Sequence, residues 1–452
     1  MSTVSERSPR DDDHCPPWKR PAVRNVLIVA LLAELAYALL NISAMPVYLA
    51  NDRGFPAGAI GMIIGAFLLT EALLKGPMGS LADRVGRKRL IVIGPIITIF
   101  TSIASLYVPR DWDYETVAFL TLRAMDGVGV AMLWPAAFAL IGESVKESQK
   151  QEAMSLLNMC YLGGIALALF VGGVVDDVFG SVTAARIDSY HAPSLYLSAV
   201  LCSFVAAFAY FKLPSGRGMR EAARQERAVS GRAAFKFTDI FATAKRIPGF
   251  LILGAVTFMG IGFPIAIVKL FAQDQLELSG TKFGILVMPA LIAMAALSPV
   301  MSRYGERLGR QRAVHIGLFL CSLGMSAIAA GAFVPQLRSV LVVALGTVPV
   351  ALGFILAVPA WYAAVSEIDR KRRAANIGAV MTAQGLGAIV GSQFGSQAYE
   401  RLQDVELFGM HLDSAFGRYS PFIGCAICII IGWLLSLRLL RKGPQPDARS
   451  VE

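Results

Sequence analysis

The sequence predicts an all-α membrane protein in which twelve transmembrane helices form two pseudo-symmetric six-helix bundles, with both termini in the cytoplasm. Long apolar stretches, an internal repeat and a biased distribution of basic residues carry this prediction. Of the 452 residues, 55% are hydrophobic and only 16% are charged, and the mean hydropathy is +0.58. Because a soluble globular domain has about 25% charged residues, most of this chain is suited to lipid rather than to water.

Apolar stretches of roughly 20 residues or more recur along the chain, and each is long enough to cross a hydrocarbon core of about 30 Å as a helix. The expected spans are 23–50, 57–82, 89–108, 115–142, 151–175, 193–213, 248–272, 281–302, 313–333, 338–366, 374–400 and 418–440. They divide the chain into an N-terminal bundle at 23–213 and a C-terminal bundle at 248–440. We expect cytoplasmic tails at 1–22 and 441–452 and a cytoplasmic linker at 214–247, with a short amphipathic stretch around Phe235–Ala244.

The net charge is +10, and the positions of the basic residues explain it without a nucleic-acid partner. If the N-terminus is cytoplasmic, 32 of the 42 Lys and Arg residues lie in or beside cytoplasmic segments and seven in or beside outer loops. This bias follows the positive-inside rule and predicts that both termini are cytoplasmic.

The two halves of the chain match each other at a nearly constant offset. Three glycine pairs are 223 residues apart, and three later pairs are 224 apart: Gly61–Gly284, Gly86–Gly309, Gly94–Gly317, Gly129–Gly353, Pro135–Pro359 and Glu143–Glu367. Duplication of a six-helix unit explains this agreement. Proteins with such parallel repeats are transporters whose substrate site lies near the bilayer midplane, between the halves. Transport is therefore the predicted function.

The connection after the second span, Gly79 to Arg89, reads GSLADRVGRKR. It resembles the G-x-L-A-D-R-x-G-R-K signature of the major facilitator superfamily and implies the major facilitator fold over roughly 23–440. In that family the Asp contacts the start of the eleventh helix, and an Arg pairs with an acid at the inner end of the fourth. The resemblance implies a conformational latch that holds the outward-facing state and breaks when the halves rock. Its residues are Gly79, Asp83, Gly86, Arg87 and Glu143.

The second copy of this loop, at 302–312, is degraded, because Glu306 replaces the Asp and Ser302 the first Gly. The equivalent latch partner is Glu367, so we expect a weaker second gate.

Ionisable side chains inside the spans are few, and each is a functional candidate because a charge in hydrocarbon costs about 2.5 kcal/mol or more. The fourth span contains Arg123 followed by Gly127 and Gly129, which resembles the R-x-x-x-G-x-G-x-A segment of proton-coupled superfamily members. Asp126, three residues after Arg123, is placed to neutralise it. The repeat partner of Arg123 is Thr347, so the Arg is not required by the architecture.

In the first span Glu34, Tyr37 and Asn41 are spaced to lie on one helical face, which we expect to line the cavity. Burial favours a protonated Glu34, and a nearby Arg123 favours proton release, so Glu34, Arg123 and Asp126 are the proposed proton-coupling residues. A packing contact between helices is the alternative for Glu34.

Further polar residues are expected to contribute contacts in the spans. Glu71 and Lys75 form either an internal ion pair or part of the transport site, and Lys269 is expected to snorkel toward the outer surface. Asn158, Tyr161 and Gln384 are candidate substrate-cavity residues, together with Trp134.

Drug/proton antiporters of the superfamily carry Gly-Pro-x-x-Gly-Gly in the fifth span. This chain keeps only Gly172 and Gly173 of that run. We favour proton-coupled efflux of amphipathic compounds by antiport. Proton-coupled uptake of an organic nutrient by symport, and transport of lysolipids or other amphiphiles, remain open.

Features of enzymes are missing from the sequence. It has no H-E-x-x-H, G-x-S-x-G or P-loop pattern, and its four histidines, His14, His191, His315 and His411, have no metal-ligand spacing. We expect no cofactor and no metal, a small-molecule substrate with protons as co-substrate, and a monomer in the lipid bilayer of the cell inner membrane.

Overall fold

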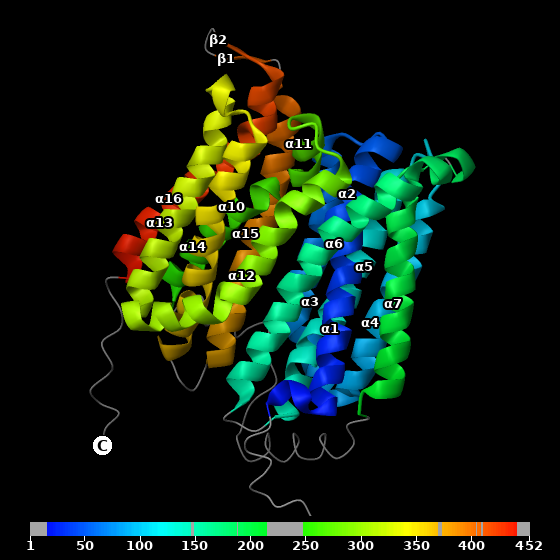
Figure 1. Cartoon of the computed structure of the whole chain (residues 1–452), viewed down its shortest axis with the longest axis vertical. Helices are drawn as coiled ribbons and strands as arrows, with labels where there is room; N and C mark the ends of the chain where they lie inside the picture. Colours follow the sequence, from blue (N-terminus) through cyan, green and yellow to red (C-terminus); the bar gives the residue numbers. More distant parts are fainter. Residues whose placement is uncertain are drawn as a thin grey trace, which may run out of the picture.

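The protein is built almost entirely from helices that run side by side (Figure 1). The computed structural model describes residues 16–145, 149–187, 189–214, 247–368, 373–403, 405–407 and 410–440. The linker stretch Phe235–Ala244 and most of both tails lie outside these ranges. The first half contains η2 Pro17–Lys19, α1 Pro21–Ala38, η3 Leu39–Ala44, α2 Met45–Val47, η4 Tyr48–Asp52, α3 Ala57–Val85, α4 Arg87–Leu106, α5 Glu115–Glu143, α6 Lys150–Ile187 and α7 Ala192–Lys212.

The second half repeats this plan. Its elements are α10 Pro248–Ile265, α11 Val268–Asp274, α12 Gly280–Leu308, α13 Arg310–Ala329, η6 Ala330–Ala332, η7 Pro335–Leu337, α14 Val340–Ile368, α15 Arg373–Arg401, β1 Val405–Leu407, β2 Met410–Leu412 and α16 Ser414–Leu439. The two short strands pair antiparallel, with Glu406 opposite His411. This hairpin was not expected from the sequence, but it lies in a connection and leaves the predicted all-α class confirmed.

Eleven helices of the described part are long and apolar enough to cross a membrane. The remaining long helix is α15, which occupies the predicted span 374–400. It carries Ser392 and Ser396, both fully buried, and Gln384, which is 3% exposed. These polar side chains face protein rather than lipid. A helix of this length can therefore cross the membrane although its hydropathy is lower than that of the other spans.

Two of the predicted spans are not continuous α-helices. The first passes through two π-helical stretches, η3 and η4, on either side of α2. Pro46 in α2 has no N–H to donate, which interrupts the regular hydrogen-bond ladder. The seventh is broken into α10 and α11 at Ala266 and Ile267, and the break begins two residues after Pro264. The fifth, α6, continues to Ile187, well past the predicted end at 175.

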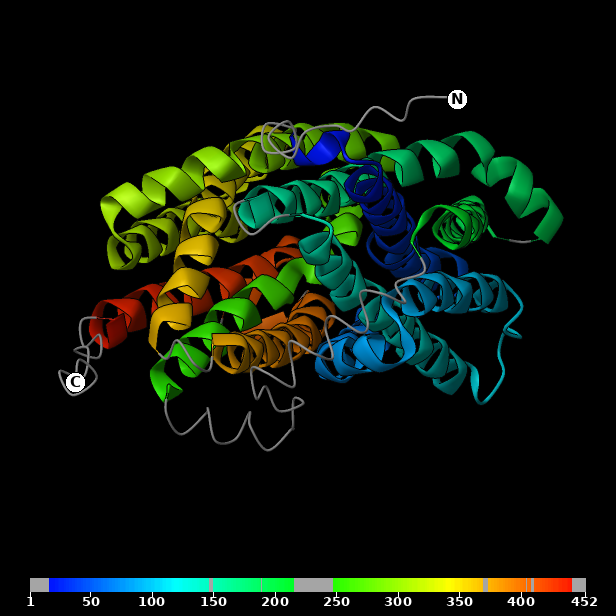
Figure 2. The same ribbon diagram turned by 90° about the horizontal axis from the view of Figure 1, so that it is seen from below.

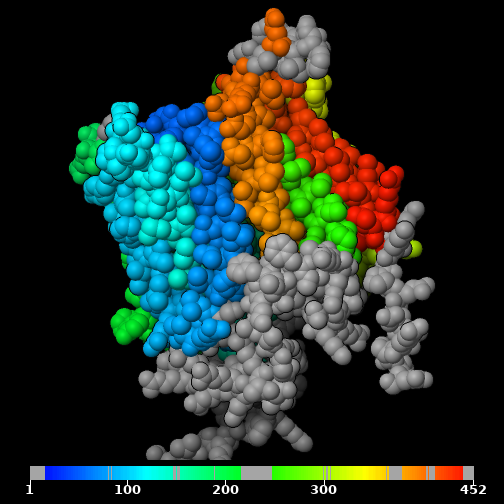
Figure 3. Space-filling view, turned by 180° about the vertical axis from the view of Figure 1, so that it is seen from behind, coloured from blue at the N-terminus to red at the C-terminus, as the bar shows by residue number. Residues whose placement is uncertain are grey.

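The helices form two groups, α1–α7 and α10–α16, which stand beside each other when viewed along the bundle (Figure 2). Contacts between the groups run mainly along α3 with α15 and α6 with α12, and the space-filling view shows α15 lying against α3 (Figure 3). A Cβ added at Gly61 of α3 would lie 2.6 Å from Ser396 Oγ, and one at Gly284 of α12 would lie 2.5 Å from Phe170 Cα. These glycines are repeat partners, so the same position permits the close approach at both crossings.

Crossings within each half are also equivalent. A Cβ on Gly94 would lie 2.5 Å from Gly129 O, and a Cβ on Gly317 would lie 2.6 Å from Gly353 O. The loop glycines match as well, because Gly86 and Gly309 have φ of 111° and 84°, a region that favours glycine. Helix pairs and turns that the repeat relates in sequence are therefore related in space.

The described chain begins at Pro16 and ends at Leu440 on the same side of the bundle, which we call the terminal end; the other side is the distal end. The halves are joined at the distal end, where Gly58 N donates to Glu400 Oε2 at 2.7 Å and Thr281 N donates to Asp177 Oδ2 at 3.0 Å. Toward the terminal end the helix axes of the two groups diverge (Figure 1). The distal side is thus the closed side of this conformation.

Candidate substrate and coupling site

Arg123 lies in a fully buried polar network inside the first half. Its Nη1 is 3.3 Å from Asp126 Oδ2 and donates to Asn41 Oδ1 at 3.1 Å, and its Nη2 donates to Ser105 Oγ at 3.3 Å. Neither Arg123 nor Asp126 exposes any surface. The predicted i,i+3 neutralisation of Arg123 by Asp126 is present in the structure.

Two threonines of α4 complete the environment of Asp126. Thr98 and Thr101 donate to Asp126 Oδ1 at 2.5 and 3.1 Å, and Asn41 Nδ2 donates to Oδ2 at 2.6 Å. The carboxylate therefore accepts hydrogen bonds at both oxygens besides its ion pair. Asp126 and Arg123 thus form a buried pair with no net charge, and its hydrogen bonds join η3, α4 and α5.

Glu34 lies elsewhere, beside Trp134 of α5. The indole Nε1 donates to Glu34 Oε2 at 3.2 Å, and Glu34 is 5% exposed. The charged groups that act on it most strongly are Glu71 and Lys75 of α3, which pair with each other at 2.7 Å. The predicted Glu71–Lys75 ion pair is thus present, next to Glu34.

The expected approach of Arg123 to Glu34 is not found. Along α5, Arg123 and the Glu34 partner Trp134 are eleven residues apart, which corresponds to about 16 Å at 1.5 Å per residue. Asn41 is hydrogen-bonded to Arg123, whereas Glu34 is hydrogen-bonded to Trp134. Residues that share one predicted helical face therefore contact different parts of α5. The carboxyl group beside Arg123 is that of Asp126, and not that of Glu34.

The other predicted cavity residues lie in three places: the boundary of the halves, the interior of the first half and, for Asn158, an exposed face of α6. The Tyr161 ring of α6 lies 5.0 Å from the Trp134 ring, centroid to centroid. Tyr161 also interacts electrostatically with Glu34 and with Tyr362 of α14, so it lies on the side of the first half that faces the second. Tyr362 Oη donates to Gln384 Oε1 at 2.7 Å. Asn158 is exposed.

Tyr37, in contrast, is 3% exposed and packs in the core of the first half, with its hydroxyl oxygen 3.4 Å from a Cβ built on Gly94.

We call Glu34, Glu71, Lys75, Trp134, Tyr161, Tyr362 and Gln384 the boundary cluster. Its three charges give a net charge of −1 when both carboxyl groups are ionised, and all three come from the first half. The second half contributes an uncharged Tyr and Gln. Aromatic rings next to a buried carboxyl group favour an amphipathic ligand and can also attract a cation.

The predicted latch residues lie at the terminal end. Arg87 pairs with Glu143, and its Nη1 also donates to Ala139 O at 3.2 Å. Both residues belong to the first half, so separating the halves does not by itself break this pair, and it is intact here although the distal side is closed. Gly79 faces Pro135 with room for a Cβ, 3.5 Å away. Asp83 lies in α3, but its side chain is outside the described part, as are the side chains of Glu306 and Glu367.

Sequence reasoning placed one buried residue, Lys269, wrongly and did not name two others, Asp176 and Tyr362. Lys269 is 2% exposed instead of snorkelling, and Asp176 is also 2% exposed. Tyr362 follows a buried Trp in an apolar helix and gave no periodic signal. Among the described residues there is no group of three His, Cys, Asp or Glu side chains that fits a metal ion.

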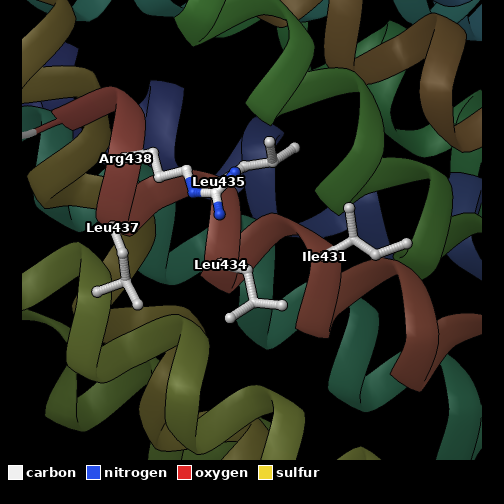
Figure 4. A pocket seen from close by; sticks show the side chains of 5 residues that line it. All are labelled: Ile431, Leu434, Leu435, Leu437 and Arg438. Atoms are coloured by element: carbon white, nitrogen blue, oxygen red, sulfur yellow. The ribbon is translucent and has the colours of Figure 1, made fainter.

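A surface pocket of about 390 Å³ lies on α16 and is lined by Ile431, Leu434, Leu435, Leu437 and Arg438 (Figure 4). Ile431 and Leu434 are 43% and 50% exposed. These are outward-facing apolar side chains typical of a lipid-facing surface, and none belongs to the boundary cluster.

A family model described as Major Facilitator Superfamily matches residues 26–392. The chain therefore belongs to the Major Facilitator Superfamily, and it is a multi-pass membrane transporter rather than an enzyme.

Similar curated proteins include an uncharacterized MFS-type transporter of Methanocaldococcus jannaschii, 23% identical over 74% of this chain and 80% of the relative. Multidrug resistance protein D of Escherichia coli is 26% identical over 36% of this chain. Quinolone resistance protein NorA of Staphylococcus aureus is 26% identical over 37%. The match covers 40% of the length of each of these two relatives.

Solved structures with the same fold include the nucleoside transporter NupG, with a TM-score of 0.70 at 15% identity over 92% of this chain and 99% of that one. An inward-facing, unoccupied bacterial homolog of the human lysosomal transporter Spinster has a TM-score of 0.70 at 16% identity over 94% and 98%. The xylose transporter XylE from Escherichia coli, partially occluded and inward open, has 0.66 at 16% over 96% and 100%. These likenesses concern the fold alone.

Proposed function

We propose that this transporter exports amphipathic compounds, cations above all, in exchange for protons that bind Glu34. The observation that carries the proposal is the position of Glu34: a buried carboxyl group bonded to an indole, beside the Glu71–Lys75 pair and Tyr161 at the boundary of the halves. A carboxyl group in such a place favours the protonated form until a cation or an opening to water arrives.

The proposed exchange follows from competition for one charge. A cationic substrate lying against Trp134 and Tyr161 stabilises ionised Glu34 and displaces its proton. A proton arriving from the other side neutralises Glu34 and weakens the hold on the substrate. Each ligand then favours the release of the other as access alternates between the two sides.

The curated relatives named for multidrug and quinolone resistance support export, although they match only part of their length. Symport of an organic nutrient is the second candidate, and the uncharged Tyr362–Gln384 pair in the second half favours it, because a hydroxyl and an amide suit a polar neutral solute.

We further propose that the terminal end faces the cytoplasm of a cell whose inner membrane holds the protein, and that the monomer is the transporting unit. The boundaries 23–213 and 248–440 stay the predicted limits of the two bundles. Arg87 and Glu143 are proposed to fix the conformation of the loop that presents Asp83 to the second half. In this proposal the ion pair stays formed when the halves rock, and the contact of Asp83 is the one that breaks.

The test uses proteoliposomes with an imposed pH gradient and ethidium as a cationic amphipathic probe. In Glu34→Gln we expect ethidium exchange without a gradient to persist and the stimulation by the gradient to be lost. Glu406→Gln is the matched control, because Glu406 is exposed on the hairpin strand β1. Full gradient-driven transport by Glu34→Gln would refute proton coupling at this residue, and accumulation of ethidium along the proton gradient would indicate symport.

A further inference from the structure

Lys269 of α11 reaches from the second half into the first. Its Nζ donates to the backbone oxygen of Ser43 at 2.7 Å and to Ser43 Oγ at 3.2 Å. Ser43 lies in the π-helical stretch η3, 226 residues earlier in the chain. Lys269 is 2% exposed and Ser43 is fully buried, so this contact between the halves is shielded from solvent. A lysine ammonium buried in this way requires compensating negative groups.

The compensating charges come from α6. Asp176 and Asp177 interact with Lys269 electrostatically without forming a direct ion pair with its Nζ. Asp176 Oδ1 accepts from Ser194 Oγ at 2.6 Å and from Ser194 N at 3.3 Å, whereas its Oδ2 is buried without a hydrogen-bond partner among the described residues. Another polar group near Asp176 is His191, whose Nδ1 lies 3.2 Å from Asp52 Oδ1. One oxygen of Asp176 is thus left to interact with charge rather than with a donor.

Close backbone packing surrounds this pair of charges. A Cβ added at Gly280 of α12 would lie 2.9 Å from Gly173 Cα of α6. The neighbouring Gly172 packs directly against Ser43. Asp177, one residue after Asp176, accepts from Thr281 N across the same boundary. The glycines bring the backbones together where Lys269 crosses, which excludes water and strengthens its interactions.

We propose that Lys269, Ser43 and Asp176 form an electrostatic distal gate, which holds the distal side of the transporter closed and must be broken when that side opens. Lys269 belongs to the second half, while Ser43 and Asp176 belong to the first. Rocking of the halves therefore separates all of its partners at once. In the closed state the ammonium has two hydrogen bonds to Ser43 and lies in the field of two carboxyl groups; in the open state it is hydrated.

This gate differs from the boundary cluster and does not depend on the identity of the substrate. Glu34 bonds Trp134 of α5, whereas Lys269 bonds Ser43 beyond Asn41 on the same transmembrane segment. The gate also gives Gly172 and Gly173 a role, because side chains there would push α6 away from η3 and α12. Failure of the proton-coupling proposal for Glu34 leaves the gate intact, and the reverse also holds.

The experiment is hydrogen–deuterium exchange of the full chain in nanodiscs, read in peptides from the distal ends of α6 and α12 and from the terminal-end loop after α3. In Lys269→Met we expect exchange at the distal ends to rise about tenfold, with unchanged or slower exchange at the terminal end. Lys269→Arg keeps the charge and should stay near the wild type. Lys282→Met is the matched control, because Lys282 is exposed two residues into α12.

A rise in exchange at the distal end without a rise at the terminal end distinguishes gating from loss of stability. Faster exchange at both ends of Lys269→Met would overturn the gate, since it would show a general loosening of the fold. Exchange equal to the wild type would overturn it as well. Asp176→Asn should open the distal side in the same direction but less than Lys269→Met. A wild-type pattern in that variant would remove Asp176 from the gate.

Discussion

The two halves of the molecule share their helix crossings and differ in their buried charges. Gly94 meets Gly129 in the first half as Gly317 meets Gly353 in the second. At the repeat offsets, however, Thr257, Thr347 and Val350 stand where the first half has Glu34, Arg123 and Asp126. Helix packing thus needs the glycines in both copies, whereas the ionisable groups are not needed to build a half. Together with Lys269 of the distal gate, the charges of the first half are therefore candidates for function.

The largest expected effect tests the cost of those charges. Arg123→Gln leaves Asp126 buried without its cation and should lower the free energy of unfolding by about 3–5 kcal/mol. The matched change in the second half, Thr347→Val, removes one hydroxyl that donates to Ala344 O at 2.7 Å, and should cost about 1 kcal/mol. Thermal unfolding of the detergent-purified proteins measures both.

A double replacement sharpens the same comparison. Arg123→Leu combined with Asp126→Leu removes both charges, so it should recover much of the stability lost in Arg123→Gln. If Arg123→Gln alone unfolds at the wild-type temperature, the pair does not stabilise the first half, and the contrast between the halves is functional only.

An intermediate effect tests whether the crossings are equivalent. Gly94→Ala and Gly317→Ala each place a Cβ against a facing backbone oxygen, at 2.5 and 2.6 Å, and each should cost about 1–3 kcal/mol. Gly163→Ala is the control, because its Cβ would meet Leu31 at an ordinary 3.8 Å. Unequal losses at Gly94 and Gly317 would break the structural symmetry, and the same unfolding assay detects them.

The smallest effect concerns the loops. Gly86→Ala and Gly309→Ala force a side chain into positive φ and should each cost about 1 kcal/mol. A neutral Gly309→Ala beside a damaging Gly86→Ala would show that the degraded loop has relaxed its turn along with its signature.

The general fold was predictable because lipid imposes simple rules on the sequence. A helix that crosses hydrocarbon needs about 20 apolar residues, so the spans were readable from composition, with ends such as Glu115 and Lys212 correct to within a residue or two. Duplication added the pairing of Gly86 with Gly309, and the Arg87–Glu143 contact followed from the family resemblance.

The internal partners were less predictable, since helices that are apolar on every face do not show which side turns inward. Pairing of Asp126 with Arg123 followed from their i,i+3 spacing, but Thr98 and Thr101 of α4 reach the same carboxylate only through tertiary packing. The spacing of Glu34 and Asn41 assumed a regular helix that meets one environment. The position of Lys269 suited snorkelling, and only the crossing of α11 over η3 reveals that it points inward.

The π-helical stretches of the first span set the register of everything that follows them. One residue more or less turns a helical side chain by about 100° around the axis. Ser43, within η3, and Tyr48, which donates to Ser105 O at 2.9 Å at the start of η4, both depend on this phase. Ser105 in turn accepts from Arg123. The winding of this single segment therefore sets the orientation of two sets of contacts. One set lies beside the Arg123–Asp126 pair of the first half, and the other is the contact of Ser43 with Lys269 of the second half.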